Sequence, residues 1–234
     1  MKSLRLAGLA LIGTSLGFIV VFSFLAARFG YPEVLNGSPD QVLPAFVAGG
    51  STLRAVWIAY AALPTGLAVA ARLVRPLLFA AGERVARFGT WSALLSAVCM
   101  TLGLLRWPTL NHVLGERYLV ASAPERARLA AWFDTGNLVL GNLIGELLGE
   151  LLLSGWFVAV GLALVRGARV WRYTGYFALC TAASMVVGSL RNLTNVVALV
   201  ADFDNTLLPV FLITLGAVLL LSPEQARTTP EEGD

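Results

Sequence analysis

Two repeats with a spacing of four residues run through the stretch Gly141-Asn142-Leu143-Ile144-Gly145-Glu146-Leu147-Leu148-Gly149-Glu150. On a helix, one ridge carries Gly141, Gly145 and Gly149, and the ridge beside it carries Asn142, Glu146 and Glu150. The glycines allow a neighbouring helix to approach closely. Carboxylates in or near hydrocarbon are costly, so the two glutamates require partners, water or a functional role.

The composition around this stretch is that of a membrane protein. Of 234 residues, 57% are hydrophobic and only 13% are charged, and the mean hydropathy is +0.76. Soluble domains carry about 25% charged residues. We therefore expect an all-α, polytopic transmembrane helical bundle in a lipid bilayer, and the sequence gives no support for nucleic-acid binding.

Six apolar segments are long enough to cross a bilayer, which takes about 20 residues each. We place these spans near 6–27, 53–73, 88–106, 145–166, 173–191 and 206–222, within a single transmembrane domain of residues 1–222. The first apolar run exceeds the roughly 7–15 residues of a signal-peptide core, so it is expected to be a retained span. Residues 223–234, with two prolines and several acids, are expected to form a disordered cytoplasmic tail.

The distribution of basic residues favours one orientation. The short loops 73–87 and 167–172 are rich in arginine and contain Glu83 as their one acid. Basic loops lie preferentially on the cytoplasmic side. With six spans, both termini are then cytoplasmic, and the long connections 28–52 and 107–144 lie outside.

Proline positions suggest how these connections fold. Tyr31-Pro32 and Trp107-Pro108 are each typical of the start of a short interfacial helix. Ala123-Pro124-Glu125 favours the start of another helix, which has no proline from there to Val165 and can run unbroken into the fourth span. Pro64 is expected to kink the second span.

The fifth span offers partners for the glutamates. Ser184, Gly188 and Asn192 repeat every fourth residue, and Arg191 is expected at the same outer level as Glu146, so that it can pair with Glu146 or Glu150. Helix packing is assigned to Gly141, Gly145, Gly149, Ser184 and Gly188. The candidate outward-facing polar pocket comprises Asn142, Glu146, Glu150, Arg191, Asn192, Arg106 and His112.

Less specific interpretations stay open for each group. Arg106 and Arg54 lie at span ends, where arginines snorkel to lipid headgroups. His112 fits a surface position on an amphipathic helix. Glu146 and Glu150 fit a structural ion pair as well as a functional site.

Cofactor chemistry finds little support. His112 is the single histidine and Lys2 the single lysine, and no Glu-x-x-His accompanies the acids, so we expect no cofactor, no metal and no catalytic residue set. Cys99 and Cys180 lie apart within apolar runs and are expected to be free thiols. Motifs of soluble hydrolases and phosphate-binding loops are absent from the sequence.

Three short motifs follow one another along the chain: Tyr31-Pro32, Arg106-Trp107-Pro108 and Gly145-Glu146-Leu147-Leu148-Gly149. In this order they resemble a bacterial family of six-span integral membrane proteins described as a domain of unknown function, over about residues 5 to 222. The resemblance implies a compact helical bundle in a bacterial cytoplasmic membrane. It implies no activity and no catalytic residues.

Three classes of function remain open from the sequence. The first is a binder or transporter of a small solute, cation or lipid headgroup. The second is a non-catalytic accessory or scaffold subunit, which contacts a membrane protein partner or forms a homo-oligomer. An intramembrane enzyme that uses a glutamate as general acid or base is the least favoured, because no second catalytic group is evident.

Overall fold

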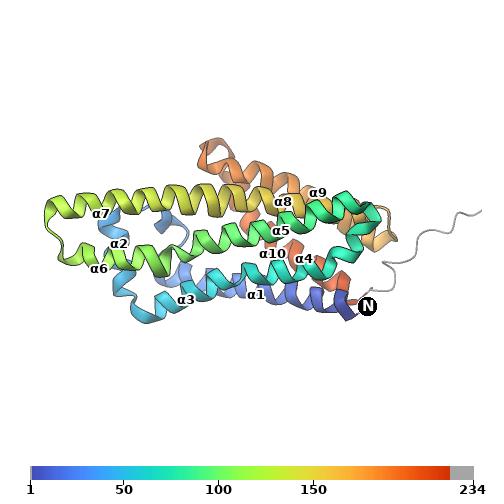
Figure 1. Cartoon of the computed structure of the whole chain (residues 1–234), viewed down its shortest axis with the longest axis horizontal. Helices are drawn as coiled ribbons and strands as arrows, with labels where there is room; N and C mark the ends of the chain where they lie inside the picture. Colours follow the sequence, from blue (N-terminus) through green and yellow to red (C-terminus); the bar gives the residue numbers. More distant parts are fainter. Residues whose placement is uncertain (1, 222–234) are drawn as a thin grey trace, which may run out of the picture.

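A computed structural model describes residues 2–221, which are helical almost throughout and contain no strand (Figure 1). Six helical segments are long and apolar enough to cross a membrane: Lys2–Phe29, Gly50–Ala81, Glu83–Val120, Ala123–Leu164, Arg169–Asn192 and Ala198–Leu221. The predicted fold class, an all-α transmembrane bundle, is confirmed, and the chain is a multi-pass membrane protein. The expected tail, 223–234, lies outside the described residues.

The elements follow one another in a simple order. The first half contains α1 (Lys2–Phe29), η1 (Glu33–Asn36), α2 (Pro39–Ala48), α3 (Gly50–Ala62), α4 (Pro64–Leu78), η2 (Phe79–Ala81) and α5 (Glu83–Leu105). The second half contains η3 (Trp107–Asn111), α6 (His112–Val120), α7 (Ala123–Gly136), η4 (Asn137–Leu148), α8 (Gly149–Leu164), α9 (Arg169–Gly188), η5 (Ser189–Asn192), η6 (Asn195–Val197) and α10 (Ala198–Leu221).

The third and fourth spans are much longer than the bilayer requires. Glu83–Val120 has 38 residues and Ala123–Leu164 has 42. At 1.5 Å per residue they extend about 57 and 63 Å, whereas the hydrocarbon core is about 30 Å thick. Their linked ends, α6 and α7, form a hairpin at the end of the bundle farthest from the N-terminus, which we call the distal end (Figure 1).

The helix beyond Trp107-Pro108 differs from the sequence expectation. No separate interfacial helix begins there, because the third helix continues through Pro108 to Val120. A π-helical turn accommodates the proline: the Asn111 amide donates to the carbonyl of Arg106, five residues back, at 2.8 Å. Thr109 Oγ1 also donates to the carbonyl of Leu105, at 2.6 Å. Pro108 itself has no N–H to donate, and these two bonds keep the carbonyls of Leu105 and Arg106 hydrogen-bonded through the distorted turn.

Two other proline-based expectations agree with the structure. The helix from Ala123 runs unbroken to Leu164. The second span is interrupted at Pro64, where α3 ends and α4 begins. Thr65 Oγ1 donates to the carbonyl of Ala62 at 2.6 Å, so the backbone at the break remains hydrogen-bonded.

The last helix begins earlier than expected. It starts at Ala198 rather than near 206, so Asp202 and Asp204 lie on a helix instead of in a loop. Pro209 lies inside this helix, and its carbonyl accepts a hydrogen bond from Ser15 Oγ of α1 at 3.1 Å. This contact ties α1 to α10 near the middle of the bundle.

The buried hydrophobic residues form two clusters that follow each other along the long axis of the bundle. The cluster nearer the chain termini joins α1, α4, α5, α8, α9 and α10 around Trp156, Phe157 and Phe211. The distal cluster joins the end of α1 to α2, α3, η3, α6 and α7 around Trp57 and Trp107. The charged site described next lies where these two clusters meet.

Candidate functional site

The repeat at 141–150 falls largely on the π-helical stretch η4. In an α-helix with about 3.6 residues per turn, an every-fourth repeat drifts around the helix axis. The wider π-helical turn, closed by i→i+5 bonds, shifts such a repeat in the opposite sense, and Gly141, Gly145 and Gly149 all face the third span, at Arg106, Gly103 and Met100. The glycines and the polar residues therefore keep to their own faces until α8 begins at Gly149.

The glycine face of η4 packs against α5. A Cβ on Gly145 would lie 3.0 Å from Cα of Gly103, so the two backbones are in direct contact. A Cβ on Gly149 would lie 3.0 Å from Met100 Cγ. Ser96 Oγ donates to the carbonyl of Gly149 at 2.7 Å. The close approach expected from the glycines thus involves the third span, not the fifth.

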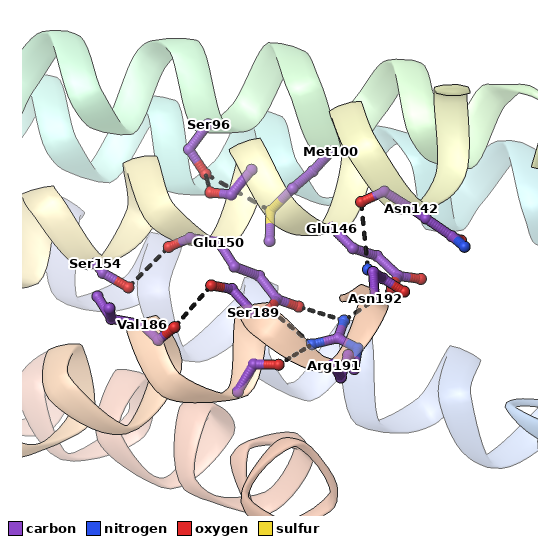
Figure 2. A network of polar contacts seen from close by, with 12 residues as sticks. Ser96, Met100, Asn142, Glu146, Glu150, Ser154, Val186, Ser189, Arg191 and Asn192 are labelled. Atoms are coloured by element: carbon purple, nitrogen blue, oxygen red, sulfur yellow. Dashed lines mark hydrogen bonds and ion pairs between the residues drawn. The ribbon is translucent and has the colours of Figure 1, made fainter. Parts of the chain in front are cut away.

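The polar face of η4 and α8 meets the end of the fifth span. Arg191 donates through Nη1 and Nη2 to the two carboxylate oxygens of Glu150, at 2.7 Å each, as Figure 2 shows. Its Nη2 also lies 3.1 Å from Glu146 Oε2. The side chains of Arg191, Glu146 and Glu150 are 28%, 24% and 18% exposed. The two-pronged pairing gives Arg191 a defined orientation between two acids.

Asn192 completes this network. Its Nδ2 donates to Glu146 Oε2 at 3.0 Å and to the carbonyl of Asn142 at 3.3 Å (Figure 2). Arg191 and Asn192 are the last two residues of the 3-10 turn η5, and both side chains reach the glutamates. Glu146 Oε1 accepts no hydrogen bond from the described residues.

Arg106 approaches η4 from the end of α5, beside Gly141, and is only 5% exposed. Its Nε donates to Asn137 Oδ1 at 3.0 Å, and its Nη1 donates to the carbonyl of Gly103. Its guanidinium carbon lies 5.5 Å from the centroid of the Trp107 ring. Within residues 2–221, Arg106 forms no ion pair and its Nη2 makes no hydrogen bond. Burying a guanidinium without an ion pair costs free energy unless its N–H groups find hydrogen-bond partners. The free Nη2 of Arg106 is therefore a candidate contact for a bound molecule.

A cavity of about 600 Å³ joins these two charged groups. Arg106, Glu146, Glu150 and Arg191 line it together with Asp202. Apolar and aromatic side chains from α1, α3, α4, α5 and α10 form most of the remaining wall. Cavities of roughly 300–1,000 Å³ with an apolar wall and a few polar groups are typical of small-molecule sites.

Aromatic side chains cover the distal end of the cavity. Trp57 and Trp107 stack with ring centroids 4.8 Å apart, and Tyr31 contacts Trp57 edge-on at 5.7 Å. Burial, and secondarily the charge of Glu146, raise the pKa of Tyr31. Its hydroxyl therefore stays protonated and available as a donor. The sequence marked Tyr31 as an interfacial residue and did not place it in the site.

The other packing residues of the fifth span face α10. Ser184 Oγ donates to Asp204 Oδ1 at 2.6 Å, and a Cβ on Gly188 would lie 2.2 Å from Asp204 Oδ2. Asp204 is buried, and its Oδ2 has no hydrogen-bond partner among the described residues. Sequence reasoning missed this carboxylate because it assigned residues 192–205 to a loop.

Some of the predicted pocket residues line the cavity, and others do not. Arg106, Glu146, Glu150 and Arg191 line the cavity, and so do Gly141 and Gly145. Asn192 binds Glu146 without lining the cavity, and Asn142 takes part through its backbone carbonyl, which accepts from Asn192. His112 lies apart, with Nε2 3.5 Å from Glu116. Arg54 is also elsewhere, where it donates to the carbonyl of Pro108.

Candidate metal ligands and thiols are dispersed. No group of three or more His, Cys, Asp or Glu side chains among residues 2–221 is arranged to hold a metal ion. Cys99 and Cys180 are both free.

Fold and site together define a multi-pass helical membrane protein with a charged cavity between two hydrophobic clusters. The chain belongs to the family described as Domain of unknown function (DUF4386), whose family model matches residues 6–221. This confirms the resemblance seen in the sequence. Comparisons with curated proteins and with solved structures gave no match.

Proposed function

We propose that this protein binds a small solute, cation or lipid headgroup in the cavity beside Glu146, Glu150 and Arg191, as a binder or as a transporter. The observation that carries the proposal is the cavity of about 600 Å³, which brings together four buried or half-buried charged side chains from three spans, besides the exposed Asp202 of α10. Ionised groups in a bundle core are costly and mark substrate pathways more often than simple packing contacts do. We propose no enzymatic activity.

Native mass spectrometry of the purified protein in mild detergent tests the proposal. We expect a bound species of less than about 1 kDa, because a cavity of this size accommodates molecules of that class. Thr206→Trp places a large ring at a position on α10 that lines the cavity, and it should lower the bound fraction. Phe203→Trp on the same helix is the control, because Phe203 is 58% exposed and does not line the cavity.

The alternative function, an accessory or scaffold subunit, gives the opposite result. In that case the cavity stays without a bound molecule, Thr206→Trp has no effect beyond that of Phe203→Trp, and the protein is recovered in a stable complex with another membrane protein. A monodisperse protein that carries a bound small molecule argues against this alternative.

We further propose that the protein resides in a bacterial cytoplasmic membrane, with both termini in the cytoplasm and the distal end outside. The arginines of loops 73–87 and 167–172 support this orientation. A fluorescent protein fused to the C-terminus should fold and fluoresce in cells, whereas alkaline phosphatase fused there should be inactive. The reverse pair of results would invert the proposed orientation.

A further inference from the structure

The wall of the cavity carries two groups whose hydrogen-bonding capacity is not used. Nη2 of Arg106 has no partner among the described residues, and neither has Oε1 of Glu146. Arg106 is 95% buried, so few ligands other than an occupant of the cavity can reach its remaining donor. The planar guanidinium fork selects oxyanions such as phosphate, and a carboxylate oxygen selects a hydrogen-bonding cation.

Asp202 lines the cavity but is exposed, and the charges of the four less exposed groups balance only when Arg106 is counted together with Arg191, Glu146 and Glu150. Arg191 neutralises one of the two glutamates that it contacts, which leaves one negative charge in that group. Arg106, at the end of α5, supplies one positive charge to the same wall. A ligand that carries both signs therefore matches this wall better than a simple anion or a simple cation does.

The cavity opens sideways between α1 and α10. Near the chain termini these helices touch, because a Cβ on Gly8 would lie 2.6 Å from the carbonyl oxygen of Gly216. Beyond the bond between Ser15 and Pro209, residues that line the cavity are exposed on both helices: Ile19 (41%) and Ser23 on α1, and Asn205 and Thr206 on α10. Val210 (48%), next to Pro209, also lines the cavity and is exposed. This opening faces the surroundings of the bundle, where apolar residues such as Ile19 meet lipid.

We propose that the cavity binds a phospholipid whose headgroup joins a phosphate to a primary ammonium. The phosphate contacts Arg106, the ammonium contacts Glu146, and the acyl chains leave between α1 and α10. This assignment rests on the proposed function of the cavity as a ligand site. It goes further by specifying headgroup chemistry and a route of entry from the bilayer.

Headgroup selectivity of the unmodified protein tests the assignment directly. In mild detergent, native mass spectrometry compares phosphatidylethanolamine with phosphatidylglycerol and phosphatidylcholine that carry identical acyl chains. We expect phosphatidylethanolamine to bind about tenfold more tightly, because the glycerol headgroup has no cation and choline has no N–H donor for Glu146. Equal binding of the three lipids would overturn the assignment. Equally tight binding of free phosphoethanolamine would also overturn it, in favour of a soluble zwitterion.

Two variants separate the two ends of the headgroup. Glu146→Gln should abolish the preference for phosphatidylethanolamine over phosphatidylglycerol while binding of both persists. Arg106→Gln should weaken binding of every phospholipid by about tenfold, because it removes the phosphate contact. If Arg106→Gln does not fold, the lipid series on the unmodified protein still decides. A preference that survives Glu146→Gln would refute the ammonium contact.

The opening is tested with a matched pair on α1. Ser23→Trp should slow or prevent lipid binding, because Ser23 lines the cavity at its exposed edge. Val20→Trp should bind lipid normally, because Val20 is 68% exposed and lies outside the lining. Equal binding by both variants would exclude entry between α1 and α10.

If the lipid tests fail while Thr206→Trp still reduces an unidentified bound species, the cavity remains a ligand site and only the ligand class is wrong.

Discussion

Gly141 provides the space that the guanidinium of Arg106 occupies, because a Cβ at position 141 would lie 2.7 Å from Arg106 Cζ. The guanidinium lies over Gly141 and donates through Nε to Asn137 Oδ1, at the start of η4. A glycine that the sequence assigns to helix packing thus positions a cavity-lining cation.

Gly141→Ala should therefore impair ligand binding more than it impairs folding. The added methyl meets the far end of a side chain, so Arg106 can move, but it then loses the bond to Asn137 and its place in the cavity wall. We expect destabilisation of about 1 kcal/mol and a drop in phospholipid binding of about tenfold. Thermal unfolding followed by circular dichroism gives the first quantity, and native mass spectrometry gives the second. Unchanged phospholipid binding would mean that Arg106 does not contribute to the binding site.

Gly103→Ala should impair folding more than it impairs ligand binding. Its Cβ would lie 2.7 Å from Cα of Gly145, and a backbone contact cannot yield as a side chain can. The helices α5 and η4 must separate, at a cost of about 2–3 kcal/mol. Gly13→Ala on α1 is the control, because nothing lies within 4 Å of its Cβ position. Equal melting temperatures for the two variants would show that the close approach of α5 and η4 is unimportant for stability.

The cluster of Glu146, Glu150 and Arg191 could be predicted from the sequence. The spacing of four residues placed Glu146 and Glu150 on one face, and the outward direction of the fifth span brought Arg191 to their level. Helix periodicity and span direction suffice for such a pair. They do not identify which helix packs against Gly145. A row of glycines allows any helix to approach closely, so it does not distinguish α5 from α9 as the partner.

The remaining site residues depend on details that periodicity does not report. The π-helical turns at 107–111 and 137–148 set the direction of Arg106, and no residue pattern in those segments predicts them. Asp202 and Asp204 lower the hydropathy of the first turns of α10, which moved the predicted span start to 206. The structure extends the helix over them to Ala198, and Ser184 of α9 binds one of these carboxylates.

The ion pair between Arg191 and Glu150 should show strong coupling in a double-mutant cycle. Arg191→Gln leaves two adjacent carboxylates without their cation, and Glu150→Gln removes the two-pronged acceptor. We expect each single variant to lose about 3 kcal/mol of stability, and the double variant to lose less than the sum. Thermal or denaturant unfolding in mild detergent measures the four proteins. Additive losses would mean that the two side chains do not interact in the folded protein.

Asp204 gives the last prediction, because its buried carboxylate depends on one donor. Ser184→Ala removes the hydrogen bond to Oδ1 and leaves the carboxylate without a side-chain donor from α9. We expect a loss of about 1–3 kcal/mol, and a smaller loss for Ser184→Ala combined with Asp204→Asn, because an uncharged amide is less costly to bury without partners. Thr135→Ala is the control, since its exposed hydroxyl bonds only to the carbonyl of Ala131 in its own helix. Unfolding curves that coincide for Ser184→Ala and Thr135→Ala would mean that water, rather than Ser184, satisfies Asp204.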